Sequence, residues 1–420
     1  MQLQAGAEAL CSRLGTWQTA RGRGPVLAVR ATALADGCAL GLSVHHSVAD
    51  GRSAAAFLAL LARTYRGLRA GEDPRPAPFP PNPLRSAAWG GWARDDDDAA
   101  ADGAEVDLEK GEGGPPLRRR PSQLEEAVRK GLCLGGGTPC EAVDDAPAED
   151  PEARCTPAFL DRSFSHPWTV LKALFRIAFL PGRPETLRLR VPKPLLLRLR
   201  RRAATPSSHD ALVALLWQAW AAALAAEEGA AAAGLPCWLS VAVDLRKHVE
   251  PAVPDAAMGT VVGTGMPDGL RPGEVEAAAL DLLARKVRKA VQGIAANATT
   301  AVNFVESAVD QDLQLRRGTA EAPMQLARLL HVTYLNEDLH RQGDFGHGPA
   351  AAVLPAIEWP IDFDENMVVM VPVPKAQGGG MDVFIRLPSR RTGGFLAQWN
   401  ARVDTLLGEA GGAGGGGGTK

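Results

Sequence analysis

The segment Val44–Gly51 places two adjacent histidines, His45 and His46, at the end of an apolar run, with an acidic residue, Asp50, four positions after the second. A histidine is the side chain best suited to act as a neutral base near pH 7. The apolar run before the histidines is typical of a strand, and the alanine- and leucine-rich run after Gly51 is typical of a buried helix. The histidines therefore lie in a short loop that a rigid scaffold holds, which suits a residue that takes part in a reaction.

The same residues also have a structural interpretation. A histidine near an apolar strand is most often a hydrogen-bonded core or loop residue, and this is the expectation for His45. Asp50 can cap the following helix, because an aspartate there accepts hydrogen bonds from free N–H groups of the first turn. Capping and a part in a site are not exclusive, so this segment alone leaves a catalytic and a structural role for His46 evenly balanced.

A second segment, Asp344–Gly348, reads Asp-Phe-Gly-His-Gly. The two segments together resemble the BAHD acyltransferases, which transfer acyl groups from coenzyme A thioesters and carry His-x-x-x-Asp-Gly and Asp-Phe-Gly-Trp-Gly in this order. The first motif alone is weak, because condensation domains and chloramphenicol-type acetyltransferases share it, whereas the pair is specific. The resemblance also covers residues 207–217 and 243–246, and it extends from about Pro25 to the last helix apart from one acidic insertion.

The resemblance implies an α/β, chloramphenicol-acetyltransferase-like fold of two domains, with mixed β-sheets flanked by helices. The N-terminal domain is expected at residues 1–181 and the C-terminal domain at 185–408, with a flexible tail at 409–420. Within the first domain, 91–156 is rich in carboxylates, glycine and proline, which predicts a disordered insertion. Fewer residues precede His46 than in similar proteins, so either the gene model is truncated or the N-terminal domain is reduced.

The resemblance also assigns roles to individual residues. It implies that His46 is the general base, in the middle of a tunnel between the domains. Asp50 is expected to point away from the substrate and to form a buried pair with Arg246, which fixes the loop beside Gly51. A structural clasp away from the reacting atoms is expected at the second motif, with Asp344, Gly346 and Gly348 as its motif residues.

Two positions depart from the family pattern. Some members carry Thr-Ser-Trp eleven residues before the second motif and use it at the oxyanion; here the same spacing holds Thr333-Tyr334-Leu335. Thr333 is a candidate oxyanion donor, but Leu335 has no N–H to replace that of an indole. His347 stands where the family has tryptophan. These departures support a second hypothesis, a catalytically impaired homologue that binds ligands or partners. A condensation-type domain is a third, and the second motif speaks against it.

Composition restricts the partners. With a net charge of −2 over 420 residues, the charge of the chain gives no indication that it binds nucleic acid. None of its six cysteines forms a Cys-x-x-Cys pair, so no metal site is expected and free thiols are predicted. No uncharged apolar run reaches the length of a membrane span. We expect a cytoplasmic monomer of secondary metabolism that binds acyl-CoA as co-substrate and a small-molecule alcohol or amine as acceptor, without a further cofactor.

Periodicity predicts the elements that position these motifs. Residues 25–32 and 38–44 are expected to form a hairpin that ends at the histidines, and a helix is expected from Gly51 to about Gly67. Ser207 and Asp210 predict a capping box at the start of a buried helix. Residues 251–265 are expected to be a loop and 274–295 one long helix. Further strands are predicted at 185–191, 237–243, 331–335, 367–373 and 381–387, a basic helix at 195–202, and a closing helix at 395–407.

Overall fold

The computed structural model describes residues 8–12, 14, 25–46, 48–72, 79–80, 184–205, 207–249, 252–296, 328–355 and 366–408. The expected insertion at 91–156 and the tail at 409–420 lie outside these residues. The boundaries of the two expected domains therefore stay a prediction.

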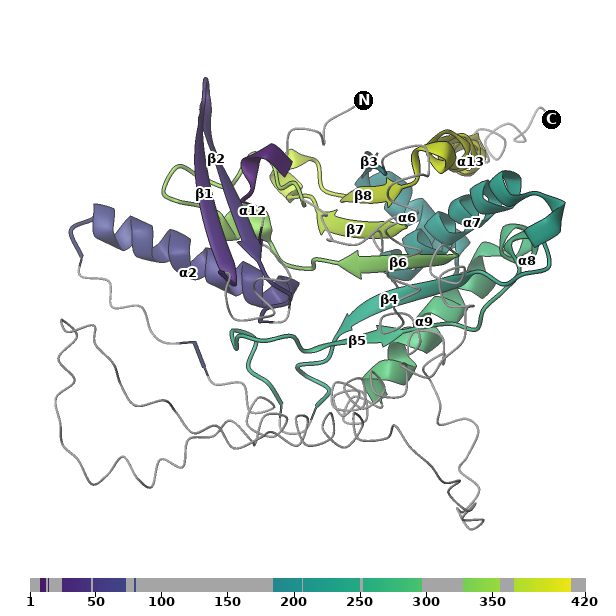
Figure 1. Cartoon of the computed structure of the whole chain (residues 1–420), viewed down its shortest axis with the longest axis horizontal. Coiled ribbons are helices and arrows are strands. Elements are labelled where there is room, and N and C mark those ends of the chain that lie inside the picture. The colour runs from purple at the N-terminus through teal and green to yellow at the C-terminus, as the bar shows by residue number, and fades with distance from the viewer. Residues whose placement is uncertain are drawn as a thin grey trace, which may run out of the picture. The chain divides into compact units, whose positions relative to one another are not determined.

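A six-stranded mixed sheet forms the centre of the described chain (Figure 1). Its order is β3-β8-β7-β6-β4-β5, and the two central pairs, β4 with β6 and β6 with β7, are parallel while the others are antiparallel. The strands are β3 (Glu185–Val191), β4 (Trp238–Asp244), β5 (Val262–Gly265), β6 (Leu329–Tyr334), β7 (Met367–Pro372) and β8 (Met381–Leu387). The sheet is the mixed α/β arrangement that the sequence predicts.

One face of this sheet is covered by helices, which together with it enclose the main hydrophobic core. Helix α7 lies at the centre of this layer, and its tryptophans Trp217 and Trp220 are fully buried. The helices are α6 (Lys193–Arg202), α7 (Ser208–Glu228), α8 (Pro272–Ala277), α9 (Leu280–Ala296) and α13 (Ser389–Gly408). Because α7 is buried nearly all round, it lacks the polar stripe of a surface helix.

Helix α7 is also long and apolar enough to span a membrane, and among the described helices it alone passes that test. However, 83% of its most apolar 18-residue window is buried inside the protein. Packing against the sheet and four neighbouring helices accounts for this apolar composition.

The first motif belongs to a smaller part of the structure. Strands β1 (Leu27–Leu34) and β2 (Gly37–Val44) form an antiparallel hairpin, and α2 (Gly51–Arg69) follows after a short loop. The remaining short elements are the 3-10 helices η1 (Glu8–Leu10), η5 (Ala230–Ala232) and η6 (Lys375–Gln377), and the single turn α12 (Leu339–Gln342). The hairpin and helix confirm the elements predicted around His46.

The structure corrects the expected loop at 251–265, because Val262–Gly265 is strand β5. The strand pairs with β4 in antiparallel register. The sequence pattern did not indicate a strand because glycines stand where strands usually carry larger side chains. A Cβ on Gly263 would lie 2.7 Å from the Leu245 side chain, and one on Gly265 would lie 2.8 Å from the backbone of α9, so only glycine fits at these positions. The close approach of α9 therefore selects glycine over the usual β-branched residues.

The single helix expected at 274–295 is two helices, α8 and α9, because Ala278 between them is extended (φ −64°, ψ 144°). The Ala-rich sequence at this point has good helix propensity, and the tertiary structure overrides it. Of the two hydrogen bonds of the predicted capping box, the structure has the one from the backbone of Asp210 to the side chain of Ser207. The Ser207 hydroxyl accepts a hydrogen bond from the Asp210 N–H (3.3 Å), while the Asp210 carboxylate pairs with Arg288 (2.6 Å) of α9.

Candidate active site

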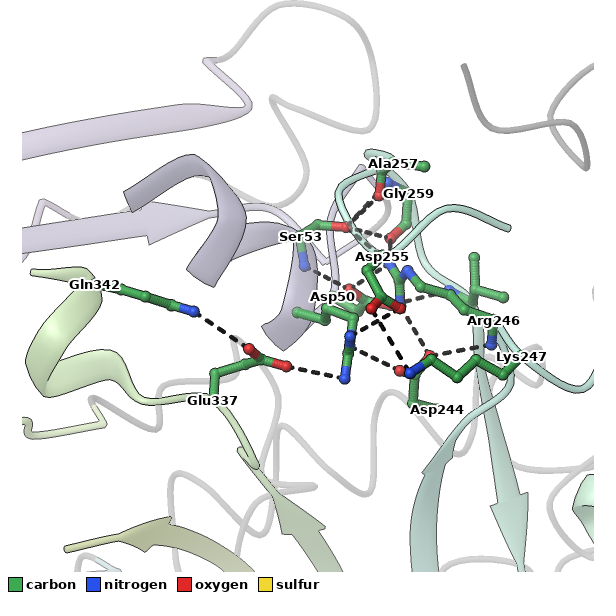
Figure 2. A network of polar contacts seen from close by, with 12 residues as sticks. Asp50, Ser53, Asp244, Arg246, Lys247, Asp255, Ala257, Gly259, Glu337 and Gln342 are labelled. Carbon is green, nitrogen blue, oxygen red and sulfur yellow. Dashed lines mark hydrogen bonds and ion pairs between the residues drawn. The ribbon is translucent and has the colours of Figure 1, made fainter. Parts of the chain in front are cut away.

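A buried ion pair joins the first turn of α2 to the loop after β4 (Figure 2). Nη1 of Arg246 donates to Oδ2 of Asp50 (2.7 Å), and Nη2 donates to Oδ1 (2.9 Å), so the pair is bidentate. Both side chains are buried, with exposed fractions of 0% for Arg246 and 2% for Asp50. This confirms the pair expected from the sequence and connects residues that lie far apart in the chain.

Asp50 also caps α2, because Oδ1 accepts a hydrogen bond from the Ser53 N–H (2.9 Å) and Oδ2 accepts one from the Val261 N–H (3.0 Å). Burial by itself would raise the pKa of Asp50, but the hydrogen bonds from Arg246 and these two N–H groups outweigh it and keep the pKa below its ordinary value. Burial would likewise lower the pKa of Arg246, and Asp50 raises it instead. Both groups are therefore charged at neutral pH.

The backbone carbonyl of Gly259 completes this junction. It accepts hydrogen bonds from Nη2 of Arg246 (3.1 Å), from the Ser53 hydroxyl (2.8 Å) and from the Asp50 N–H (3.3 Å). Gly259 has φ 143°, a backbone conformation that side chains with a Cβ rarely adopt. This glycine therefore turns its carbonyl toward the start of α2.

A second arginine, Arg52 in the first turn of α2, extends the contacts outside the buried pair. It forms ion pairs with Asp244 at the end of β4 (2.8 Å), with Asp255 in the following loop (3.0 Å) and with Glu337 after β6 (3.0 Å). Asp244 also accepts from Nη1 of Arg246 (3.1 Å), so the two arginines share one carboxylate (Figure 2). These contacts tie the first turn of α2 to the end of β4 with its following loop and to the segment after β6.

His46 lies in the turn between β2 and α2, four residues before the capping aspartate, and it is exposed. Its backbone carbonyl accepts a hydrogen bond from the Thr260 hydroxyl (2.5 Å), and the His45 N–H donates to the carbonyl of Val26 (2.8 Å). The main chain is thus fixed on both sides of the turn. His45 is less exposed than His46, which agrees with the structural role expected for it.

A second histidine, His331 of β6, is influenced electrostatically by His46. His46 contributes to lowering the pKa of His331, after the larger effect of burial, and the pKa falls from 6.5 to about 4. Nδ1 of His331 lies 2.5 Å from the hydroxyl oxygen of Ser240, its partner on the adjacent strand β4. Sequence analysis gave neither residue a role. The available signals were a histidine two positions before Thr333, hence on the same face of a strand, and a serine inside an apolar strand.

Gly51 and Leu335 lie against each other. A Cβ on Gly51 would be 2.5 Å from Cδ2 of Leu335, so the leucine side chain reaches the first residue of α2. Leu335 also packs against an apolar cluster of β7 and β8 on the sheet face opposite the helices. Leu335, which stands where the family pattern has tryptophan, is therefore a packing residue between the sheet and α2. A leucine side chain has no N–H, so position 335 supplies no hydrogen-bond donor beside Thr333.

The second motif packs at the other end of α2. The Oδ1 atom of Asp344 accepts hydrogen bonds from the N–H groups of Gly346 (2.8 Å) and Gly348 (3.0 Å), which have φ 98° and 93°. The Arg66 guanidinium donates to the Asp344 carbonyl. These positive φ values explain why glycines occupy the loop.

The other contacts of this loop also involve the last turns of α2. The Phe345 ring meets that of Tyr65 edge-on at 5.7 Å, and Nε2 of His347 lies 3.3 Å from Nη1 of Arg69. At about 1.5 Å of rise per residue, about 20 Å of helix separates this loop from Gly51. The loop thus has the geometry of a clasp away from His46, while its role in function stays a prediction.

No metal-binding group is evident in the part of the chain that the structure describes, in the sense of three or more clustered His, Cys, Asp or Glu side chains. The described cysteines, Cys11, Cys38 and Cys237, are not joined to one another by disulfide bonds. Burial raises the pKa of the Cys237 thiol to about 12, so this buried thiol is not a nucleophile.

A family model described as the Transferase family matches residues 12–75 and 197–400, which include both motifs and both members of the buried pair. This chain belongs to that family, the BAHD acyltransferases. A comparison with functionally curated proteins finds no match in sequence.

The fold is also found in solved members of the family. The structure of vinorine synthase is 16% identical with a TM-score of 0.52, and the match covers 97% of this chain and 75% of that one. TRI101 of F. sporotrichioides, solved with coenzyme A and T-2, is 15% identical with a TM-score of 0.52, covering 90% and 70%. TRI101 of F. graminearum with coenzyme A and deoxynivalenol is 14% identical with a TM-score of 0.54, covering 90% and 70%. These similarities confirm the chloramphenicol-acetyltransferase-like fold.

Proposed function

We propose that this BAHD acyltransferase moves an acyl group from an acyl-CoA thioester to the hydroxyl or amine of a small-molecule acceptor, with His46 as the general base. The observation that carries the proposal is the placement of His46. Its imidazole is exposed, whereas the backbone around it is fixed by Thr260 and by the buried pair that begins α2. A base held in this way is available to a bound acceptor and does not depend on substrate for its position.

The proposed reaction is a direct attack within a complex of both substrates. His46 takes the proton of the acceptor hydroxyl as its oxygen attacks the thioester carbonyl, which forms a C–O bond and a tetrahedral oxyanion. Collapse of this intermediate breaks the C–S bond, and the departing thiolate takes the proton from His46. No enzyme nucleophile is required, and a positioned base contributes about a hundred- to ten-thousandfold in rate.

The structures of TRI101 support this assignment of substrates, since they were solved with coenzyme A together with T-2 or deoxynivalenol. We infer that the present chain likewise takes acyl-CoA as a co-substrate and needs no further cofactor. We also propose that it acts as a cytoplasmic monomer in secondary metabolism. A catalytically impaired homologue is the second candidate, and the observation that favours it is the use of Leu335 in packing where a donor is expected.

The test is thiol release from a panel of acyl-CoA thioesters with alcohol and amine acceptors, comparing wild type with His46→Ala. We expect acceptor-dependent release by the wild type and loss of at least a hundredfold in the variant, with an unchanged circular dichroism spectrum. His248→Gln is a matched control, because this histidine is also exposed and the proposed reaction gives it no role. Full activity of His46→Ala excludes its role as base, and a wild type that releases no thiol with any donor supports the impaired homologue.

A further inference from the structure

The face of β6 that is turned away from the helices carries a second set of polar side chains. Leu330 and Val332 of this strand belong to the core beneath the helices. Because side chains alternate along a strand, His331 and Thr333 lie on the opposite face. That face continues to Leu335, which touches the start of α2, and His46 is the second cause, after burial, of the lowered pKa of His331. The strand therefore presents two hydrogen-bonding groups on the side where His46 lies.

The hydrogen bond to Ser240 decides which nitrogen of His331 carries the proton. Ser240 is buried, with 1% of its surface exposed. Among the described residues, the hydroxyl has Nδ1 of His331 as its hydrogen-bond partner, at 2.5 Å. A buried hydroxyl donates its hydrogen where an acceptor is available, so Nδ1 is the acceptor. The ring hydrogen of a neutral His331 is then on Nε2, which leaves Nε2–H as a donor directed away from Ser240.

A neutral ring is what the surroundings of His331 favour. Burial lowers its pKa to about 4, so the imidazole is uncharged at neutral pH. A neutral imidazole can donate a hydrogen bond to a developing oxyanion, in the way that some enzymes polarise a carbonyl. It also avoids placing a fixed positive charge beside His46, which would oppose proton uptake by the base.

We propose that His331, oriented by Ser240, donates a hydrogen bond from Nε2 to the oxyanion that forms when the acceptor attacks the thioester, with Thr333 as the second donor. This inference rests on the proposed acyl transfer. It assigns the donor that the chain needs in place of the indole N–H missing at Leu335. The hydrogen bonds strengthen as the carbonyl oxygen becomes negative, and no proton leaves His331. The proton of the acceptor passes to His46 and then to the thiolate, as described above.

The experiment compares His331→Leu, His331→Gln and Ser240→Ala in the thiol-release assay. Loss of one oxyanion donor costs about a hundred- to a thousandfold in kcat, so we expect a fall of this size in His331→Leu with little change in KM for acyl-CoA. His331→Gln, whose amide can donate in place of Nε2–H, should recover at least tenfold of that loss. Ser240→Ala should show an intermediate kcat, because His331 keeps its Nε2–H but loses the hydrogen bond that orients its ring.

A measurement independent of activity tests the proton position. In protein labelled with ¹⁵N-histidine, the ring nitrogens of His331 should show a neutral ring protonated on Nε2 at pH 7. A ring protonated on Nδ1 overturns the inference, and so does a His331→Leu variant with wild-type kcat. Either result leaves acyl transfer intact, because that proposal is tested by the wild type and by His46→Ala. Absence of transfer by the wild type would remove both.

Discussion

Replacing Arg246 by methionine tests how the junction between α2 and the loop after β4 is held together. Methionine fills much of the volume but removes donors to both oxygens of Asp50, to the Ser53 hydroxyl and to the Gly259 carbonyl. The Asp50 carboxylate would stay buried with two backbone N–H partners, from Ser53 and Val261. Removing one partner of a buried ion pair costs about 3–5 kcal/mol in free energy of unfolding, and we expect a loss in this range.

The pairwise part of this loss is measured by a double-mutant cycle with Asp50→Asn. Asparagine keeps a side-chain oxygen that can cap α2 but removes the charge, so this variant alone should lose about 1–3 kcal/mol. In the double variant the uncompensated charge is absent, and its loss should be smaller than the sum by about 2 kcal/mol or more. Additive losses would show that the two side chains stabilise the protein independently.

Urea unfolding, followed by tryptophan fluorescence at pH 7, measures all four proteins of the cycle. Arg52→Met is the matched control, because Arg52, in the first turn of α2, pairs with three carboxylates around the same junction but is 25% exposed. Partly exposed pairs contribute about 1 kcal/mol or less each, so this variant should lose less than Arg246→Met. An Arg246→Met protein that loses no more than Arg52→Met would refute the reasoning, since burial would then make no difference.

Three further changes have expected outcomes. Because His331 has a pKa of about 4 when folded and 6.5 ordinarily, the unfolded chain binds more protons between these values. The free energy of unfolding should thus fall by up to about 3 kcal/mol as the pH drops from 6.5 to 4, an effect that urea titrations should find absent in His331→Gln. Gly51→Ala should cost about 0.5–1.5 kcal/mol, because its Cβ pushes the flexible end of the Leu335 side chain off its rotamer, and the same change in a Leu335→Ala background should cost less; equal losses in the two backgrounds would contradict this contact. Asp344→Ala removes the acceptor of two backbone N–H groups and should lower the thermal unfolding midpoint while kcat stays near wild type; a large fall in kcat would show that the loop is more than a clasp.

Much of the site's framework could be predicted because it depends on local patterns and on the resemblance. The hairpin before His46 and the helix after Gly51 follow from hydrophobic periodicity and an N-cap residue, and the structure has both. The pair of Asp50 with Arg246 was found from the resemblance alone. Nothing in the local sequence around either residue indicates that they meet.

The parts that sequence reasoning missed depend on tertiary contacts. Strand β5 carries glycines where α9 approaches closely, so its composition resembles a loop. The partnership of Ser240 with His331 requires that β4 and β6 be neighbours in register, which strand patterns do not reveal. Likewise, the contact between Leu335 and Gly51 connects a strand end to a helix start that lies in another part of the chain.

Helix α2 contacts one signature motif at each end, and this restricts the insertions and deletions that the helix can accept. An extra residue inserted between Arg52 and Arg66 would rotate the last turn by about 100° and move it by about 1.5 Å relative to the first. The side chains that receive the Asp-Phe-Gly-His-Gly loop would then face elsewhere, even though every residue of both motifs was intact. The number of residues in this helix is therefore as important to the packing of the second motif as the motif residues themselves, and an insertion within the helix should destabilise the protein.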